Sequence, residues 1–189
     1  MELKRKMIIK KTTQVGNPVI RLKSKLVKNI QSSEVKRVVR DLTDSMRHHS
    51  LIGMAAPQIG IGLRIFVTEI RPTNLRITVE KSDALKVFIN PKITYFSKKI
   101  FGGKKVKGGF EGCGSVDDGG IFASVPRSTS VIVEAYDLDG KKFILKAEGL
   151  LARVIQHEYD HINGIIFLDR VIDTKTIFER EEYLKYIKS

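Results

Sequence analysis

The chain has 189 residues, of which 42% are hydrophobic and one is cysteine, and its formal net charge is +13. This length suits one domain whose core needs no disulfides or structural metal, so we expect residues 1–189 to form a single domain. The lone cysteine excludes an internal disulfide, and no apolar run is long enough to span a bilayer.

The N-terminal third predicts one amphipathic helix. We expect the basic residues 1–11 to lead into a strand with their lysines in solvent. Residues 33–48 predict a helix, because apolar residues recur there every three or four positions and leave the basic residues on the other side. These apolar positions are Val35, Val38, Val39, Leu42 and Met46.

The middle of the chain predicts several strands. Residues 62–70, 87–93 and 130–136 have the β-branched content that is typical of strands. Asp139 and Gly140 form a pair suited to a hairpin turn, after which residues 143–147 return. The order of these segments predicts a run of strands before the last helices.

Two further helices are expected near the C-terminus. The first begins near Glu148 or Gly149 and ends at Asn163 and Gly164, a pair suited to a left-handed cap. The second spans about residues 174–187. Strands in runs with few helices indicate an α+β fold.

The expected helix over residues 149–162 carries a metal-binding pattern. His157 and His161 are four residues apart, so on a helix they share one face and could bind one metal ion. Glu158 lies one residue further round, within reach of a water proton. Apolar residues at helical spacing make this helix mostly buried, and two buried imidazoles need partners or a metal. The pattern indicates a hydrolytic metal site.

A catalytic metal site typically takes three protein ligands. Cys113 is the favoured third ligand, because glycines on both sides of it allow close backbone approach. One protease class uses a histidine six residues after the second histidine, where this chain has Phe167. Another class uses a glutamate from a following helix, for which the nominal candidates are Glu179, Glu181 and Glu182. A zincin-type metallopeptidase therefore stays an alternative.

Three ordered motifs resemble those of the peptide deformylases. They read Leu-Ile-Gly-Met-Ala-Ala-Pro-Gln at residues 51–58, Glu-Gly-Cys-Gly-Ser at residues 111–115 and Gln-His-Glu-Tyr-Asp-His at residues 156–161. Further similarity, beginning with Gly-Asn-Pro-Val-Ile-Arg at residues 16–21, extends over about residues 14–172. The resemblance implies one deformylase-like catalytic domain of mixed β-sheets packed around the metal-bearing helix, plus a C-terminal helix.

The resemblance also implies an activity and its residues. The enzyme would remove the N-formyl group from the N-terminal methionine of new polypeptides and release formate. Cys113, His157 and His161 would bind the metal, and Glu158 would be the general base and acid. Gln58 and the Gly114 N–H would stabilise the oxyanion. The peptide would bind along residues that the resemblance places beside the metal: Ile52, Gly53 and Gly112.

Two neighbouring residues are expected to support this site. A carboxylate near a metal loop commonly forms two parallel hydrogen bonds with an arginine, and we assign such a pair to Glu111 and Arg127. Asp160, next to the ligand His161, could hold a histidine ring or face solvent, and we favour a position on the helix surface. The chain departs from the family at Leu51, usually glycine, and at Gly114, usually leucine or methionine. We expect the glycine to leave its segment mobile and without an apolar wall, so that the enzyme is modest.

Composition and resemblance together predict cofactor, partners and location. The cofactor is one divalent metal per chain, Fe²⁺ in the cell by resemblance, and Zn²⁺, Ni²⁺ or Co²⁺ also suit such ligands. Partners are formylmethionyl nascent peptides and, through the basic surface, ribosomal RNA, with no membrane. A thiolate ligand needs a reducing compartment, which the cytoplasm provides. A second alternative is a ribosome-associated binding protein that has kept the fold and lost catalysis.

Overall fold

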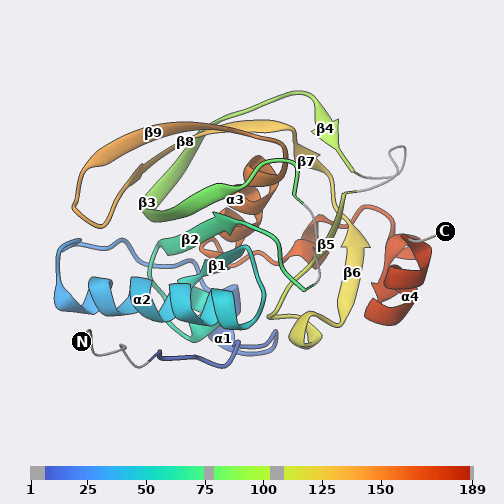
Figure 1. The fold of residues 1–189 in the computed structure, drawn as a ribbon, viewed down its shortest axis with the longest axis horizontal. Coiled ribbons are helices and arrows are strands. Elements are labelled where there is room, and N and C mark those ends of the chain that lie inside the picture. Colours follow the sequence, from blue (N-terminus) through green and yellow to red (C-terminus); the bar gives the residue numbers. More distant parts are fainter. Residues whose placement is uncertain (1–6, 75–78, 103–108, 188–189) are drawn as a thin grey trace.

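The main sheet of the computed structural model has five antiparallel strands in the order β1-β2-β3-β8-β9, as the ribbon in Figure 1 shows. The structure describes residues 7–74, 79–102 and 109–187. The strands of this sheet are β1 (Gly53–Ala55), β2 (Ile65–Ile70), β3 (Asp83–Phe96), β8 (Ser130–Tyr136) and β9 (Lys142–Glu148). Strand β1 is therefore an edge strand.

Smaller elements form the other end of the molecule. A three-stranded sheet has the order β10-β6-β5, and β4 pairs with β7. These strands are β5 (Phe110–Gly112), β6 (Ile121–Ser124), β10 (Phe178–Glu179), β4 (Ile100–Phe101) and β7 (Arg127–Ser128). The α-helices are α1 (Pro18–Arg21), α2 (Ser33–His48), α3 (Gly149–His161) and α4 (Arg180–Tyr186). Single 3₁₀ turns are η1 (Ala56–Ile59), η2 (Asp117–Gly119), η3 (Phe167–Arg170) and η4 (Thr174–Thr176).

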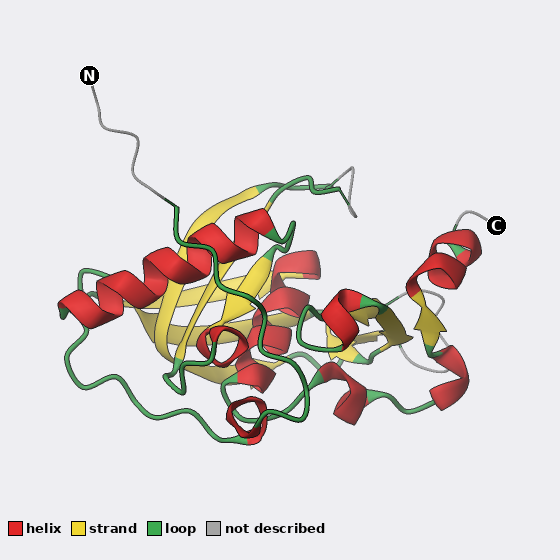
Figure 2. Cartoon of the chain, turned by 90° about the horizontal axis from the view of Figure 1, so that it is seen from below, coloured by secondary structure: helices red, strands yellow, loops and turns green. Residues whose placement is uncertain are grey.

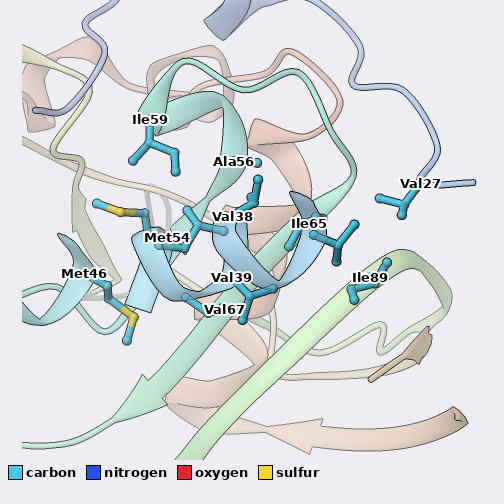
Figure 3. Packing of buried hydrophobic residues seen from close by; sticks show 12 residues of the cluster. Val27, Val38, Val39, Met46, Met54, Ala56, Ile59, Ile65, Val67 and Ile89 are labelled. Atoms are coloured by element: carbon cyan, nitrogen blue, oxygen red, sulfur yellow. The ribbon is translucent and has the colours of Figure 1, made fainter. Parts of the chain in front are cut away.

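Helices α2 and α3 cover opposite faces of the β1–β2 end of the sheet. Successive residues of a strand point to opposite faces, so Met54 and Val67 pack with α2 whereas Ala55 and Phe66 pack with α3. Figure 2 shows α2 lying across the sheet, and Figure 3 shows the cluster between them. Helix α3, which carries the metal-binding pattern, is thereby held against β1, which is part of the first motif, and against β2, which follows that motif.

The predicted fold class is confirmed, and most predicted elements are observed. Helix α2 has the predicted bounds and begins after Ser32, whose hydroxyl accepts a hydrogen bond from the Val35 N–H. Strand β8 also has the predicted bounds, and its hairpin to β9 turns at Gly140 with a φ of 80°. Strand β3 is longer than predicted because it pairs with strands on both sides.

Both ends of the chain differ from the prediction. Within residues 7–11 the structure has no strand; Ile8 and Lys10 donate their N–H groups to side chains of α2 instead. The helix predicted over residues 174–187 is wrong in length, because β10 pairs with β6 before α4 begins at Arg180. No helix in the described part of the chain is long and apolar enough to cross a membrane.

Helix α3 ends as its sequence predicts. Gly164 has a φ of 77°, and a Cβ added there would overlap the backbone oxygen of Arg21. Gly164→Ala should therefore lower the free energy of unfolding by about 2 to 4 kcal/mol, which combines left-handed strain with overpacking.

A matched control is Gly140→Ala, because Gly140 has a φ of 80° and no backbone atom near its absent Cβ. Only the left-handed strain applies there, so the loss should be about 1 kcal/mol. Urea unfolding of both variants measures the difference, and equal losses would show that the contact with α1 is unimportant.

Candidate metal centre

Three side chains from two distant segments meet beside α3. The Cys113 Sγ lies 3.2 Å from the His161 Nε2, and one ligand atom from each of Cys113, His157 and His161 lies within 4.8 Å of the others. Among the described residues, Cys113, His157 and His161 form the cluster of potential ligands that is close enough to hold a metal ion. The pattern on α3 and the single cysteine are thus brought together as the sequence predicts.

The histidines are oriented by their surroundings. The His157 Nδ1 lies 3.0 Å from a Glu111 carboxylate oxygen, which leaves its Nε2 for a ligand. The His161 Nδ1 is buried with no hydrogen-bond partner among the described residues. A thiolate and two imidazoles are ligands of divalent transition metals, so the residues present fit such an ion.

Electrostatics favour the ionised thiol. Burial alone would raise the pKa of Cys113, but the charge of His161 and hydrogen bonds with both histidines hold that pKa well below its usual value. Burial alone would lower the pKa of His157, but hydrogen bonds to Cys113 and Glu111 raise it well above its usual value. The ligand set therefore has a ready anionic sulfur, the form that binds metals.

Glu158 lies in the same buried space. Burial is the main cause that raises the pKa of its carboxyl group to about 7. Its Oε2 is buried and has no hydrogen-bond partner among the described residues. A Cβ added to Gly53 would lie 2.5 Å from the Glu158 Oε1 and 2.6 Å from a Val154 methyl carbon, so only glycine fits there. The structure thus places Gly53 directly against the predicted general base.

Gln58 is buried beside the thiol rather than on the surface. The 3₁₀ turn η1 holds it, and its Oε1 accepts a hydrogen bond of 2.8 Å from the Ala55 N–H. This bond fixes the orientation of the amide, so its Nε2 lies 3.6 Å from the Cys113 Sγ. A donor is thereby held next to the predicted metal ligands.

The predicted pair of Glu111 and Arg127 is present and belongs to a larger buried network. Two N–H groups of Arg127 donate to the two carboxylate oxygens of Glu111, each at 3.0 Å. Arg153 donates to Glu111 at 3.0 Å as well. The charge of Arg127 and the contact with His157 outweigh the effect of burial and lower the pKa of Glu111 to about 2.

Three members of this network differ from what the sequence predicts or were not predicted from it. Asp160 is buried, so its expected surface position is wrong: it accepts hydrogen bonds from Arg127 at 2.5 Å and from Arg170 at 2.8 Å. Arg153 lies four residues before His157, and this helical spacing was a signal for it. Nothing in the sequence pattern points to Arg170, which comes from η3.

The predicted peptide-binding residues lie on two strand edges. Gly53 belongs to β1, the edge strand of the large sheet, and Gly112 belongs to β5, an edge strand of the three-stranded sheet. A Cβ added to Gly112 would lie 2.8 Å from the Phe122 ring. The Ile52 carbonyl accepts a hydrogen bond from the Glu69 N–H at 2.9 Å.

Gly114 is less free than its residue type suggests. Its carbonyl oxygen accepts a hydrogen bond of 2.7 Å from the Gln14 side chain. A Cβ added there would lie 3.3 Å from a Thr12 carbon and 3.4 Å from a Leu51 methyl carbon. Gly114 therefore has a hydrogen-bond restraint that its residue type does not reveal, and Leu51, the other departure from the family, lies beside it.

The glutamates considered as alternative ligands have another role. Glu179 caps α4, where its carboxylate accepts hydrogen bonds from the N–H groups of Glu181 and Glu182. These residues are not part of the group around Cys113.

Comparisons with known proteins agree with this geometry. A family model described as polypeptide deformylase matches residues 9–176. A peptide deformylase of Thermomicrobium roseum is 40% identical over 173 residues, covering 90% of each chain. One of Dictyoglomus turgidum is 35% identical over 92% of this chain and 100% of its own. The crystal structure of a class I type b peptide deformylase from Acinetobacter baumannii, bound to Met-Ala-Ser, has a TM-score of 0.79 at 27% identity, covering 88% of this chain and 100% of that one.

Metal analysis tests the ligand assignment. Cys113→Ala should abolish stoichiometric metal binding, because it removes the only anionic ligand of the group. The triple variant Glu179→Gln, Glu181→Gln, Glu182→Gln should keep one metal per chain. Elemental analysis of both proteins measures this, with circular dichroism to confirm folding. Full occupancy in Cys113→Ala, or loss in the triple variant, would contradict the assignment.

Stability against pH tests the buried carboxylate. Glu111→Gln should lower the free energy of unfolding at pH 7 by about 3 kcal/mol, because it leaves buried arginine charge without a partner. In the folded protein the pKa of Glu111 is about 2, below its ordinary value of 4.5, so the folded state binds fewer protons. The stabilisation is then fully present above pH 4.5 and lost as the pH falls toward 2.

Urea unfolding of both proteins across this range should show their difference shrinking as the pH falls. Glu134→Gln, which removes an exposed pair with Lys142, is the control and should change little at any pH. A difference between wild type and Glu111→Gln that stays constant down to pH 2 would contradict the ionised pair.

Proposed function

The chain belongs to the polypeptide deformylase family, whose enzymes remove the N-formyl group from nascent peptides, and we propose that Cys113, His157 and His161 hold its catalytic metal. The observation that carries this proposal is the meeting of these three side chains beside a buried, partnerless carboxylate oxygen of Glu158. The family is metal-dependent. A divalent cation held there would supply Lewis acidity, polarising the formyl carbonyl and lowering the pKa of a water molecule.

Glu158 is proposed as the group that moves protons. A carboxyl group with a pKa of about 7 gains and loses a proton readily near neutral pH. It would take a proton from the attacking water and deliver it to the amine that leaves when the C–N bond of the formamide breaks. The absence of a side chain at Gly53 leaves the space that the Glu158 carboxylate occupies.

Gln58 and Gly114 are proposed to bind the oxyanion that forms during attack. Donors fixed in advance are effective because no reorganisation is needed as charge develops. The Gln58 amide is fixed through the Ala55 N–H, and Gly114 follows the thiolate directly in the chain. Both lie next to Cys113, where the reacting carbonyl would be.

The peptide substrate is proposed to bind between two strand edges. Strands β1 and β5 are edge strands, and an extended peptide can add to an exposed sheet edge through backbone hydrogen bonds. Ile52, Gly53 and Gly112 lie at or next to these edges. At both glycines the space of the missing side chain is filled from within the protein, by Glu158 and Val154 at Gly53 and by Phe122 at Gly112.

Metal identity, organisation, location and a further partner complete the proposal. We infer Fe²⁺ in the cell, with Zn²⁺, Ni²⁺ and Co²⁺ as ions that also suit one sulfur and two nitrogens. One catalytic domain is supported by the family match over residues 9–176. The thiolate supports a reducing compartment such as the cytoplasm. The net charge of +13, including basic residues exposed within residues 21–28, supports contact with ribosomal RNA.

Turnover tests the proton-transfer role. Glu158→Gln keeps the shape of the side chain and should keep the metal, but it should lower the rate of formate release from formyl-Met-Ala-Ser by roughly 10² to 10⁴-fold. Glu148→Gln is the control, because Glu148 is exposed and pairs with Lys146; it should retain wild-type turnover. Near-normal turnover in Glu158→Gln would place the proton chemistry elsewhere, and no turnover in iron-loaded wild type would overturn the activity itself.

A further inference from the structure

One extended segment near the N-terminus contacts both proposed oxyanion donors. The Thr13 N–H donates to the Gln58 carbonyl at 2.8 Å, and the Val15 N–H donates to the Ser115 carbonyl at 2.8 Å. Residues 12–15 therefore bridge the turn that carries Gln58 and the loop that follows Cys113. These segments are far apart in the sequence, so the bridge fixes their relative position.

The side chain of Gln14 reaches into the same loop. Its Nε2 donates to the Gly114 carbonyl at 2.7 Å and to a carboxylate oxygen of Asp118 at 2.8 Å. Its Oε1 accepts a hydrogen bond from the Asp118 N–H at 3.1 Å. The amide therefore has both ends occupied, and its NH₂ group is held against the Gly114 carbonyl.

Asp118, the partner of Gln14, lies in a turn that is bound by another segment. Asp117 and Asp118 both have a positive φ, of 51° and 46°, a left-handed conformation that is uncommon for non-glycine residues. Arg180 at the start of α4 donates to the carbonyl oxygens of Asp118 at 3.0 Å and of Gly119 at 2.7 Å. The partner that orients Gln14 is thus itself fixed from the C-terminal side.

Gly114 is the residue that most needs such a restraint. Glycine has the widest choice of backbone torsions, and φ and ψ of Gly114 set the angle between the peptide plane that carries its N–H and the plane that carries its carbonyl. The first plane is held at its other end, because the Cys113 carbonyl accepts a hydrogen bond of 3.0 Å from the Val116 N–H. The next residue is already fixed, because the Ser115 N–H points at the Cys113 Sγ at 3.4 Å and its carbonyl is bound by Val15. Without Gln14 the Gly114 carbonyl would lack this donor; in the structure the Gln14 side chain binds it.

We propose that Gln14 is a positioning residue for deformylation. By holding the Gly114 carbonyl it fixes the peptide plane that follows Gly114, and so the Gly114 torsions that join this plane to the one whose N–H faces the developing oxyanion. The inference rests on the proposed function, in which that N–H is a donor. Gln14 acts through Gly114 and does not itself contact the reacting atoms.

Steady-state kinetics separate this role from a general effect on folding. A donor that acts on the oxyanion contributes in the transition state, so its misplacement lowers kcat more than it changes KM. With metal-loaded protein and formyl-Met-Ala-Ser, Gln14→Ala should lower kcat roughly tenfold, less than the 10² to 10³-fold typical of removing an oxyanion donor, with KM within about twofold. Metal content should stay at one per chain.

The matched control is Gln31→Ala. The Gln31 Nε2 also donates to a backbone carbonyl, that of Asp139 at 2.9 Å, in an exposed turn at the β8–β9 hairpin. Its kinetics should match wild type. A kcat in Gln14→Ala equal to that of Gln31→Ala would overturn the proposal.

Two further variants keep the proposal testable if Gln14→Ala folds poorly. Gln14→Lys retains a donor for the Gly114 carbonyl and an attraction to Asp118, and it should keep kcat within about threefold of wild type, as expected when the charge-assisted donor replaces a neutral one. The exchange Gln14→Glu with Asp118→Asn restores a hydrogen bond between positions 14 and 118, but it leaves the Gly114 carbonyl without its donor. Its kcat should stay low.

Recovery of kcat by the exchanged pair would overturn the proposal, because contact between positions 14 and 118 would then suffice. Low kcat in Gln14→Lys with full metal would overturn it as well. Failure of the proposed function looks different: the metal-loaded wild type itself would release no formate. An active wild type with an unaffected Gln14→Ala refutes only the role of Gln14.

Discussion

The buried carboxylate of Glu111 is the constraint on which the site depends. It comes from β5, whereas the histidines come from α3, and its two oxygens contact Arg127, Arg153 and His157. A buried charge is costly unless charged partners and hydrogen bonds satisfy it. Because these partners are present, Glu111 fixes the strand that leads to Cys113 at the distance from α3 that the metal ligands need.

The packing of α3 against β1 determines which residue can lie next to Glu158, the proposed general base. Glu158 is buried between α3 and β1, and the absence of a side chain at Gly53 makes that burial feasible. Burial in turn raises the pKa of the carboxyl group to about 7. A packing requirement at β1 is thus directly connected to the proton chemistry, since a bulkier residue would displace the carboxylate.

Segments from both ends of the chain stabilise the loop after the thiol. The extended residues 12–15 bind it on one side, and Arg180 of α4 binds the turn η2 on the other. The loop contains Gly114, which has no side chain to pack, so its conformation depends on backbone hydrogen bonds from elsewhere. Thr12 and Leu51 border the position that a Cβ at residue 114 would take, at 3.3 and 3.4 Å.

The sequence by itself determined the elements and the ligand types. Helical spacing predicts α2 and puts His157 and His161 on one face of α3, because periodicity is a local property of the chain. Short motifs in the sequence also identified Cys113, Gln58 and the Glu111–Arg127 pair. Only the tertiary structure decided that Asp160 is buried, that β10 interrupts the last helix, and that Gln14 binds Gly114. The reason is physical. Each of these contacts joins residues that no helix or strand repeat relates to one another, so whether they meet depends on how the sheets and helices pack.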